Sequence, residues 1–244
     1  MAGALTGQVV VVFGGSSGIG LAAAKAAQAE GASVMIIGRD VEKLRAASAT
    51  IAGSDWRSTD VTDVDGVARA VAHLGVIDHV FVSAGQGGAS DVLTSTAEEL
   101  RRPFEERVFG TFNVVRAVAP KMREGSIILM SGMYASRIRP HASAQTAALC
   151  AVESLARTLA LDLAPTRVNA VAPGWIDTPR LDRSFGAEKA SRIEATARQL
   201  PGKRIGGAHE VAAAVLLLMT NPYINGEVLH IDGGGRFASV PGAT

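Results

Sequence analysis

The stretch VVVVFGGSSGIG, residues 9–20, decides the fold of this chain. It begins as a continuous apolar run, which is typical of a β-strand buried on both faces of a parallel sheet. Gly14, Gly18 and Gly20 then separate this strand from an alanine-rich helix that ends near Gly31. Glycines at such a junction serve a tight turn, and they also let backbone amides approach a pyrophosphate that the helix dipole attracts. Their position directly between strand and helix favours a nucleotide-binding loop over a purely steric turn.

Strands and helices alternate along the rest of the chain. Apolar runs predict further strands at 33–38, 76–84, 125–131, 166–173 and 227–232, with a weaker candidate at 56–61. Helical patterns lie between them, at 41–52, 63–73, about 96–122, 142–163 and 208–220. The alternation predicts an α/β fold, a single domain over residues 1–244 with a doubly wound, Rossmann-like parallel sheet. Residues 178–206 interrupt the alternation, and we expect them to form a helical lid over the ligand crevice.

The composition excludes several classes of protein. Apolar residues make up 48% of the 244 residues and charged residues 19%, which excludes extensive disorder. The formal net charge of +1 gives no electrostatic reason to expect nucleic acid or a membrane surface as a partner. The longest apolar run, residues 212–219, is too short to span a bilayer. The N-terminus lacks the basic segment of a secretion signal, so we expect a cytoplasmic protein.

The number and positions of the cysteine and histidine residues indicate neither an internal disulfide nor a metal site. Cys150 is the single cysteine, which excludes an internal disulfide and suits a reducing compartment. Because it lies among alanines on a predicted helix, we expect a small buried core residue rather than a reactive thiol. Most of the histidines are dispersed through predicted helices and strands and form no metal-ligand pattern: His73, His79, His209 and His230.

Several motifs together resemble those of the short-chain dehydrogenase/reductase superfamily over nearly the whole chain. The family's glycine motif appears as Phe13-Gly14…Gly18-Ile19-Gly20, and its proline–glycine motif stands in VNAVAPGWIDTP, residues 168–179. Its Asn-Asn-Ala-Gly turn is altered to VSAG at 82–85, and GEVLHIDGGG at 226–235 resembles its last strand and loop. The resemblance implies a set of nicotinamide-cofactor contacts: Gly14, Ser16, Ser17, Gly18, Ile19, Gly20, Arg39, Asp60, Val61, Ala84, Gly85, Pro173, Gly174, Ile176 and Thr178.

The end of the second strand bears on the choice of cofactor. NAD-preferring relatives carry a carboxylate there, which holds the ribose hydroxyls and repels a 2′-phosphate. Here that position is Gly38, and the next residue is Arg39, whose guanidinium suits the 2′-phosphate of NADP. We therefore favour NADP(H) over NAD(H). The alternatives are that Arg39 is a solvated loop residue, or that Asp40 serves as the ribose partner.

The resemblance also implies four catalytic positions, which the family fills with Asn, Ser, Tyr and Lys. The segment SAQTAALCAV, residues 143–152, aligns without a gap on the family's SAYSASKAAV. Gln145 then stands at the tyrosine position, Leu149 at the lysine position, Gly132 at the serine position and Arg107 at the asparagine position. Glutamine cannot deliver the proton that follows hydride transfer, and loss of a positioned acid typically costs about two to four orders of magnitude in rate. The sequence therefore predicts a non-standard active site.

Three other residues are candidate substitutes for the missing groups. Ser131 either takes the oxyanion-binding role or is an ordinary serine at a strand end. Tyr134 and His141 lie on the loop before the Gln145 helix, and either is a candidate proton donor or a solvated loop residue. Arg107 either binds a carboxylate or enolate, or pairs with a carboxylate such as Glu106.

These observations leave three classes of function open. The first is an NADP(H)-dependent oxidoreductase that acts on a small carbonyl or alcohol and uses a relocated proton donor. The second is a non-redox enzyme, such as an isomerase, dehydratase or cyclase. The third is a catalytically inactive NADP(H)-binding sensor or subunit. The resemblance implies a homodimer or homotetramer, whereas an inactive subunit would belong to a hetero-oligomer. The sequence does not select a substrate.

Overall fold

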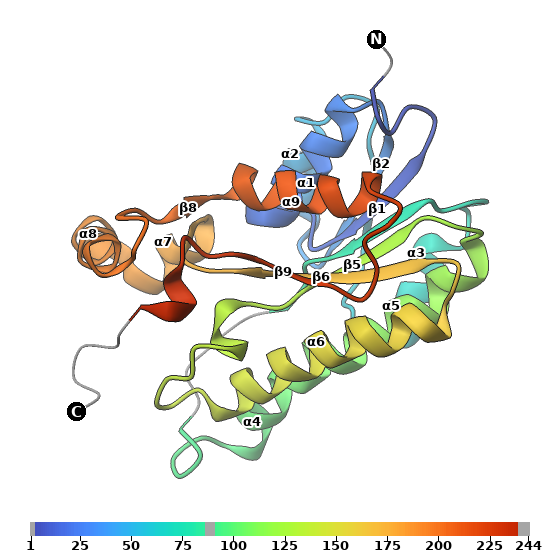
Figure 1. The fold of residues 1–244 in the computed structure, drawn as a ribbon. Coiled ribbons are helices and arrows are strands. Elements are labelled where there is room, and N and C mark those ends of the chain that lie inside the picture. The colour runs from blue at the N-terminus through green and yellow to red at the C-terminus, as the bar shows by residue number, and fades with distance from the viewer. Residues whose placement is uncertain (1–2, 86–90, 239–244) are drawn as a thin grey trace.

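A fully parallel sheet of seven strands forms the centre of the protein (Figure 1). The computed structural model describes residues 3–85 and 91–238. The strand order is β3-β2-β1-β4-β5-β6-β9, which confirms the predicted α/β, Rossmann-like fold. The strands are β1 (Val9–Phe13), β2 (Ser33–Gly38), β3 (Asp55–Ser58), β4 (His79–Val82), β5 (Ser126–Met130), β6 (Arg167–Pro173) and β9 (Val228–Ile231).

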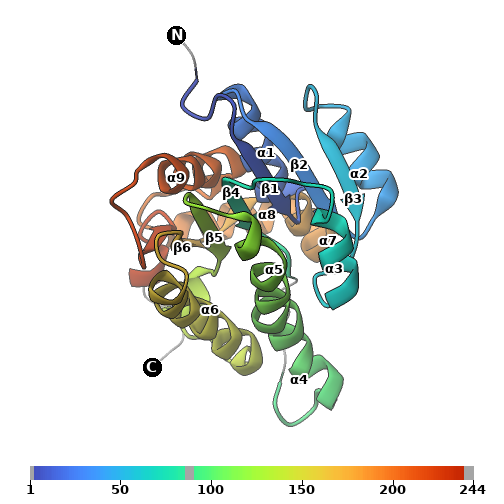
Figure 2. The ribbon, with the colours of Figure 1, turned by 90° about the vertical axis from the view of Figure 1, so that its right-hand side faces the viewer.

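Helices cover both faces of this sheet, as Figures 1 and 2 show. One face carries α1 (Gly18–Ala29), α2 (Val41–Ser48) and α9 (Ala208–Thr220), and the other carries α3 (Val64–Val71), α5 (Gly110–Val118) and α6 (Ser143–Asp162). Val10 and Val12 of β1 pack into the first layer, and Val11 and Phe13 into the second. Successive side chains of a strand point to opposite faces, so a strand that is buried on both faces needs an unbroken apolar run.

The order in which strands are added to the sheet reverses between β1 and β4. Strands β2 and β3 extend the sheet on one side of β1, whereas β4 and the later strands extend it on the other. In doubly wound sheets the ligand crevice lies outside the carboxyl ends of the strands at this switch point. Gly14 follows β1 and Ser83 follows β4, so both lie at the crevice.

The helix predicted over about 96–122 is interrupted in the structure. It consists of α4 (Ala97–Phe104), a π-helical turn (Glu105–Phe109) and α5. Thr96 and Glu99 cap the start of α4 reciprocally, and Pro103 lies inside it and lacks a backbone donor. A π-helical turn inserts an extra residue and is frequent at functional sites. This turn carries Arg107.

The insertion near 178–206 is helical, and two short paired strands hold its two ends together. Two short strands, β7 (Ile176–Asp177) and β8 (Gly206–Gly207), pair in parallel and bracket it, and the Gly206 amide donates to the Trp175 carbonyl at 2.8 Å. Between them lie α7 (Pro179–Phe185) and α8 (Lys189–Gln199). Figure 1 shows both helices beyond the end of the central sheet. The predicted helical insertion is therefore present, and α7 borders the crevice.

The expectation of a buried cysteine was wrong. Cys150 is exposed, and its Sγ approaches the Ala135 carbonyl at 3.5 Å. Helix α6 buries Ala148, Leu149 and Val152, which leaves the side chain at 150 on the opposite, outer side. Alanines line both sides of this helix, so its sequence gives little contrast between the inner and outer faces.

No helix within residues 3–85 and 91–238 is long and apolar enough to cross a membrane. Helix α6 has 20 residues but carries Glu153, Arg157 and Asp162. In the same described ranges, no three histidine, cysteine, aspartate or glutamate side chains gather as a metal ion requires.

Arg167 fastens the end of α9 to the sheet. Its guanidinium donates to the carbonyls of Leu218, Met219 and Ile224 at 2.8–3.0 Å. The last carbonyls of a helix lack partners within the helix, and a cation there also interacts favourably with the helix dipole. Burial lowers the pKa of Arg167, which reflects the cost of placing this charge inside the protein.

Replacing Arg167 by Met is expected to lower the free energy of unfolding by about 2–4 kcal/mol, because it leaves these carbonyls without their charged donor. Equilibrium unfolding in urea measures the change. Arg157→Met is the matched control, since Arg157 is exposed on α6, and its effect should stay within about 0.5 kcal/mol. Equal stability of the two variants would contradict this role of Arg167.

Candidate functional site

The glycines of the loop after β1 leave its backbone amides uncovered by side chains. A Cβ on Gly14 would lie 2.6 Å from Ser83 Oγ, and a Cβ on Gly20 would lie 2.2 Å from the Gly14 carbonyl oxygen. Gly14 and Gly18 also have positive φ angles of 84° and 56°, which favour glycine. The glycines therefore allow a backbone approach that no side chain would permit. This is the geometry that a dinucleotide pyrophosphate requires.

Helix α1 begins at this loop with its backbone donors available. Ser17 is the N-cap, but its side chain makes no capping hydrogen bond, and the first turn has no acidic residue. The first amides of a helix lack partners within the helix and carry a partial positive charge. The end of α1 at Gly18 is therefore suited to a phosphate, as the sequence predicts.

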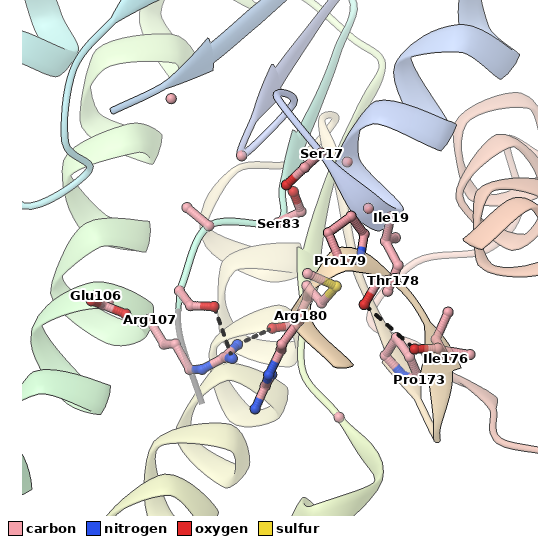
Figure 3. Close-up of a pocket in the computed structure, with 18 of the residues that line it drawn as sticks. Ser17, Ile19, Ser83, Glu106, Arg107, Pro173, Ile176, Thr178, Pro179 and Arg180 are labelled. Atoms are coloured by element: carbon pink, nitrogen blue, oxygen red, sulfur yellow. Dashed lines mark hydrogen bonds between the residues drawn. The ribbon is translucent and has the colours of Figure 1, made fainter. Parts of the chain in front are cut away.

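One pocket of about 640 Å³ extends from this loop to the loop after β5. Every cofactor contact predicted from the sequence lines it, from Gly14 through Thr178. Figure 3 shows Ser17 and Ser83 together in the upper part of this pocket, Ile19 beside Pro179 and Thr178, and Pro173 and Ile176 below them. The structure thus gathers residues from the carboxyl ends of β1, β2 and β6 and from the loops after β3 and β4 at a single site that fits a dinucleotide. Their contacts with a cofactor stay a prediction.

Charged side chains mark one end of the pocket. Arg39 lies 3.4 Å from Asp60 and 3.9 Å from Glu106, with its side chain half exposed. Burial opposes ionisation of Asp60, but hydrogen bonds from Thr62 and the charge of Arg39 outweigh it and lower the Asp60 pKa. These contacts to Arg39 are long, which leaves its guanidinium free to turn toward a phosphate.

Asp40 is occupied elsewhere. Its carboxylate accepts the Lys43 amide at 3.0 Å as the N-cap of α2, and it pairs with Lys43 Nζ at 2.8 Å. The hydrogen bonds from Lys43 lower its pKa. A capping carboxylate is fixed in orientation, so Asp40 is less suited to hold ribose hydroxyls than a free strand-end carboxylate. Lys43 also lines the pocket and adds a second cation beside Arg39.

The four catalytic positions predicted from the family all line the opposite end. Gln145 is 3% exposed, and its Oε1 is buried without a hydrogen-bond partner. Leu149 is 2% exposed and apolar. At Gly132 a Cβ would fit without a clash, because it would lie 3.7 Å from the nearest atom, which belongs to Leu149. These three positions therefore offer no acid or base for proton transfer.

Arg107 fills the fourth position and places a charge in the pocket. It is 6% exposed, and it donates to the carbonyls of Gly85 and Met130 at 3.3 Å each. Burial lowers its pKa to about 10, with Arg180 acting in the same direction and Glu106 partly opposing it. The guanidinium is thus still charged at neutral pH. Such a group stabilises negative charge that develops on a substrate oxygen.

The three candidate substitutes for the missing catalytic groups differ in their position relative to the pocket. Tyr134 lines the pocket, and burial raises its pKa above the ordinary value despite the nearby arginines. Ser131 also borders the pocket, but its hydroxyl lies 2.9 Å from Glu153 Oε1 and so is already engaged. His141 is not among the described residues that line the pocket. It is exposed and lies 2.6 Å from Asp91 Oδ2, so the structure does not bring it to the site.

The sequence analysis missed several residues of this pocket. They are Lys43, Arg139, Trp175, Arg180 and Arg183. Trp175 adjoins the proline–glycine motif, and Arg180 and Arg183 lie on α7 within the predicted lid. Their basic character is visible in TPRLDR, residues 178–183, but their proximity to Arg107 depends on how the insertion folds back.

Comparisons with known proteins agree with this architecture. The family model described as enoyl-(acyl carrier protein) reductase matches residues 2–235. An oxidoreductase from Sarocladium schorii is 33% identical over 243 residues, covering 94% of this chain and 96% of its own. The ligand-free aldohexose dehydrogenase of Thermoplasma acidophilum superposes with a TM-score of 0.88 at 31% identity, covering 98% of both chains.

A further solved relative carries a bound cofactor. It is an NADPH-bound short chain oxidoreductase from Pseudomonas aeruginosa PAO1 that contains an atypical catalytic center. It superposes with a TM-score of 0.87 at 32% identity, covering 93% of this chain and 96% of its own. The glycine loop, the sheet topology and these matches lead to one conclusion. The chain belongs to the short-chain dehydrogenase/reductase superfamily, an oxidoreductase family that binds nicotinamide cofactors.

Proposed function

We propose that this protein is an NADP(H)-dependent oxidoreductase of a carbonyl or alcohol substrate, with a non-standard active site. The single observation that carries the proposal is the continuity of the pocket. One end offers bare amides and basic residues for a dinucleotide, and the other offers Arg107 and Tyr134 for a reacting oxygen. A protein that only held the nucleotide would have no need of a second, chemically equipped end.

Three features support NADP(H) over NAD(H). Gly38 leaves no carboxylate at the end of β2, and Asp40 is fixed as a helix cap. Arg39 and Lys43 together offer two cations to a 2′-phosphate. The Pseudomonas aeruginosa relative binds NADPH.

Two side chains of this chain account for the proton and charge chemistry. NADPH, held by the glycine loop and by Arg39 and Lys43, would supply the hydride that reduces the carbonyl carbon. Arg107 then stabilises the negative charge that develops on the carbonyl oxygen, and the Tyr134 hydroxyl donates a proton to that oxygen, which completes the alcohol. Because its pKa is raised, Tyr134 is protonated at neutral pH and can act as the donor. In the oxidation direction the same groups act in reverse.

Gln145 has a positioning role in this scheme. Its Oε1 has no partner in the structure and is able to accept a hydrogen bond from a ligand, but the amide cannot deliver a proton at neutral pH. A substrate hydroxyl or the cofactor carboxamide is the kind of donor that it would satisfy. Leu149 supplies only an apolar wall, so α6 contributes no cation, and in our proposal Arg107 takes that role at the reacting oxygen.

The surface outside the pocket supports self-association. Phe109 and Phe112 are 52% and 38% exposed beside and within α5, and Leu161 of α6 is 80% exposed. We propose a cytoplasmic homodimer or homotetramer joined through these helices. Light scattering should give two or four times the monomer mass of 25.1 kDa, and the double variant Phe109→Ser/Phe112→Ser should shift it toward the monomer. A monomer at high concentration would contradict the proposal.

Replacing Arg39 and Lys43 together by Met is expected to weaken NADPH binding by about 100-fold or more, because charged hydrogen bonds to a phosphate contribute about 1.5–3 kcal/mol each. NADH binding should change little, since NADH lacks the 2′-phosphate. Calorimetric titration of both cofactors measures the difference. Arg45→Met is the control, because Arg45 is exposed on α2 and already pairs with Glu42. Equal losses for NADPH and NADH would argue against a 2′-phosphate site.

Tyr134→Phe is expected to lower kcat for carbonyl reduction by about 100-fold or more, because it removes the proton donor and keeps the ring. The NADPH dissociation constant should stay unchanged. Wild-type reduction should lose rate only at high pH, as the raised pKa of Tyr134 is approached and the donor is lost. Tyr223→Phe is the control, since Tyr223 is the only other tyrosine and is 98% exposed.

This measurement also separates the competing classes of function. Unchanged turnover in Tyr134→Phe would exclude Tyr134 as the donor but leave the reductase intact. Tight NADPH binding without oxidation of the cofactor by any carbonyl compound would instead favour the non-redox enzyme or the inactive binding protein.

A further inference from the structure

The pocket divides its charges unevenly between its two ends. Around Arg39 and Lys43, cations and carboxylates alternate and pair: Asp40, Asp60 and Glu106 each lie within 4.0 Å of a cation. At the other end, the charged residues that line the pocket are all arginines: Arg107, Arg139, Arg180 and Arg183. The charge of Glu106 partly offsets that of Arg107, but no carboxylate in the described ranges lies in an ion pair with Arg139, Arg180 or Arg183. The substrate end therefore holds an excess of positive charge.

Two of these arginines face one another across the pocket. Figure 3 shows Arg107 reaching in from its helix while the Arg180 side chain ends beside it. The two charges act on each other, since Arg180 is among the causes that lower the pKa of Arg107. Arg180 in turn interacts with Arg139 and Arg183, and these like charges lower its own pKa after burial, which is the largest cause. Like charges that converge in a cavity repel unless an anion lies between them.

Hydrogen-bonding groups at this end also lack partners. Five buried side-chain nitrogen or oxygen atoms in the described residues have no hydrogen-bond partner, and three of them belong to pocket residues. They are Arg107 Nε, Arg139 Nε and Gln145 Oε1. Buried polar groups in folded proteins are rarely left unpaired, so two free guanidinium donors in one cavity indicate a missing acceptor.

Aromatic rings complete the wall of this end. Tyr134 meets Trp175 edge to face at 6.5 Å, and Trp175 stacks on Phe185 at 5.9 Å. Arg139 lies over the Tyr134 ring at 4.6 Å, which fixes its guanidinium against an apolar surface. An apolar wall beside unpaired arginines fits a ligand with an apolar body and a charged group.

We propose that the substrate end binds a carbonyl compound that carries an oxoanionic group, carboxylate or phosphate, on an apolar body. Arg180 and Arg139 hold the anion, with Arg183 adding positive potential at the mouth, while Arg107 faces the reacting oxygen. The inference rests on the proposed oxidoreductase function for the reaction but not for binding. Guanidinium groups suit both anions, because their paired donors match two oxygens.

Tryptophan fluorescence gives a readout that needs no turnover. The chain has two tryptophans, and Trp56→Phe leaves Trp175 in the pocket wall as the only one. The NADP⁺ complex of this protein is titrated with matched pairs of probes. Benzoylformate is compared with its neutral methyl ester, and dihydroxyacetone phosphate with dihydroxyacetone. The first pair tests carboxylate on an aromatic body, and the second tests phosphate.

We expect an anionic probe to bind at least about tenfold more tightly than its neutral partner, as a charge-assisted pair typically provides. Arg139→Met and Arg180→Met should each reduce this preference by about tenfold, and Arg180→Lys should retain part of it. Arg198→Met is the matched control, because Arg198 lies on the neighbouring α8, pairs with Glu194 and does not line the pocket. Circular dichroism and thermal melting check that each variant is folded.

Three results would overturn the inference: equal binding of acid and ester, no binding of any anionic probe, or NADP⁺ affinity that falls as much as probe affinity in the arginine variants. The last would mean that these arginines hold cofactor phosphates. Charge-dependent binding without oxidation of NADPH would contradict the reductase and keep the anion site. If the protein reduced neutral carbonyl compounds equally well with and without Arg139 and Arg180, the reductase would stand and the anion site would be contradicted.

Discussion

The close approach of the β1 loop to the end of β4 is the constraint on which the rest of the site depends. Gly14 packs against Ser83 so tightly that a single added carbon would lie 2.6 Å from the serine hydroxyl. This contact occurs where the strand order of the parallel sheet reverses, so the crevice at the carboxyl ends of the strands begins there. The first amides of α1 then face the crevice. The remaining pocket residues follow the other strands and line the crevice beyond this contact.

In our proposal, the proton donor and the cation of this pocket lie on different elements from those that carry them in the family. In the family, the tyrosine and lysine of one helix supply proton and cation, but here α6 presents Gln145 and Leu149. The cation instead comes from Arg107 on the π-helical turn, and the hydroxyl comes from Tyr134 on the loop after β5. A guanidinium in a buried setting stabilises an oxyanion strongly, because little water competes for it. In our proposal no group on α6 donates the proton or supplies the cation, and Gln145 serves only to position the ligand.

The sequence predicted most of the fold because its signals are local. An apolar run such as that of β1 and an alanine-rich helix such as α1 determine their own structure, and the glycine spacing located the cofactor end. Local signals failed where three-dimensional packing decides. Alanines on both sides of α6 concealed the exposure of Cys150, and the sequence around Pro103 did not reveal the π-helical turn that holds Arg107. The convergence of Arg180 with Arg107 joins residues 73 positions apart, which no periodicity encodes.

The central claim is that the two ends of this pocket serve a single hydride transfer. It is tested most directly by incubating the protein with NADPH deuterated at C4 of the nicotinamide and with benzoylformate, and by analysing the mandelate by mass spectrometry. We predict mandelate that carries one deuterium on its carbinol carbon, formed much more slowly by Tyr134→Phe. Tight binding of both NADPH and benzoylformate with no deuterated product would contradict the claim.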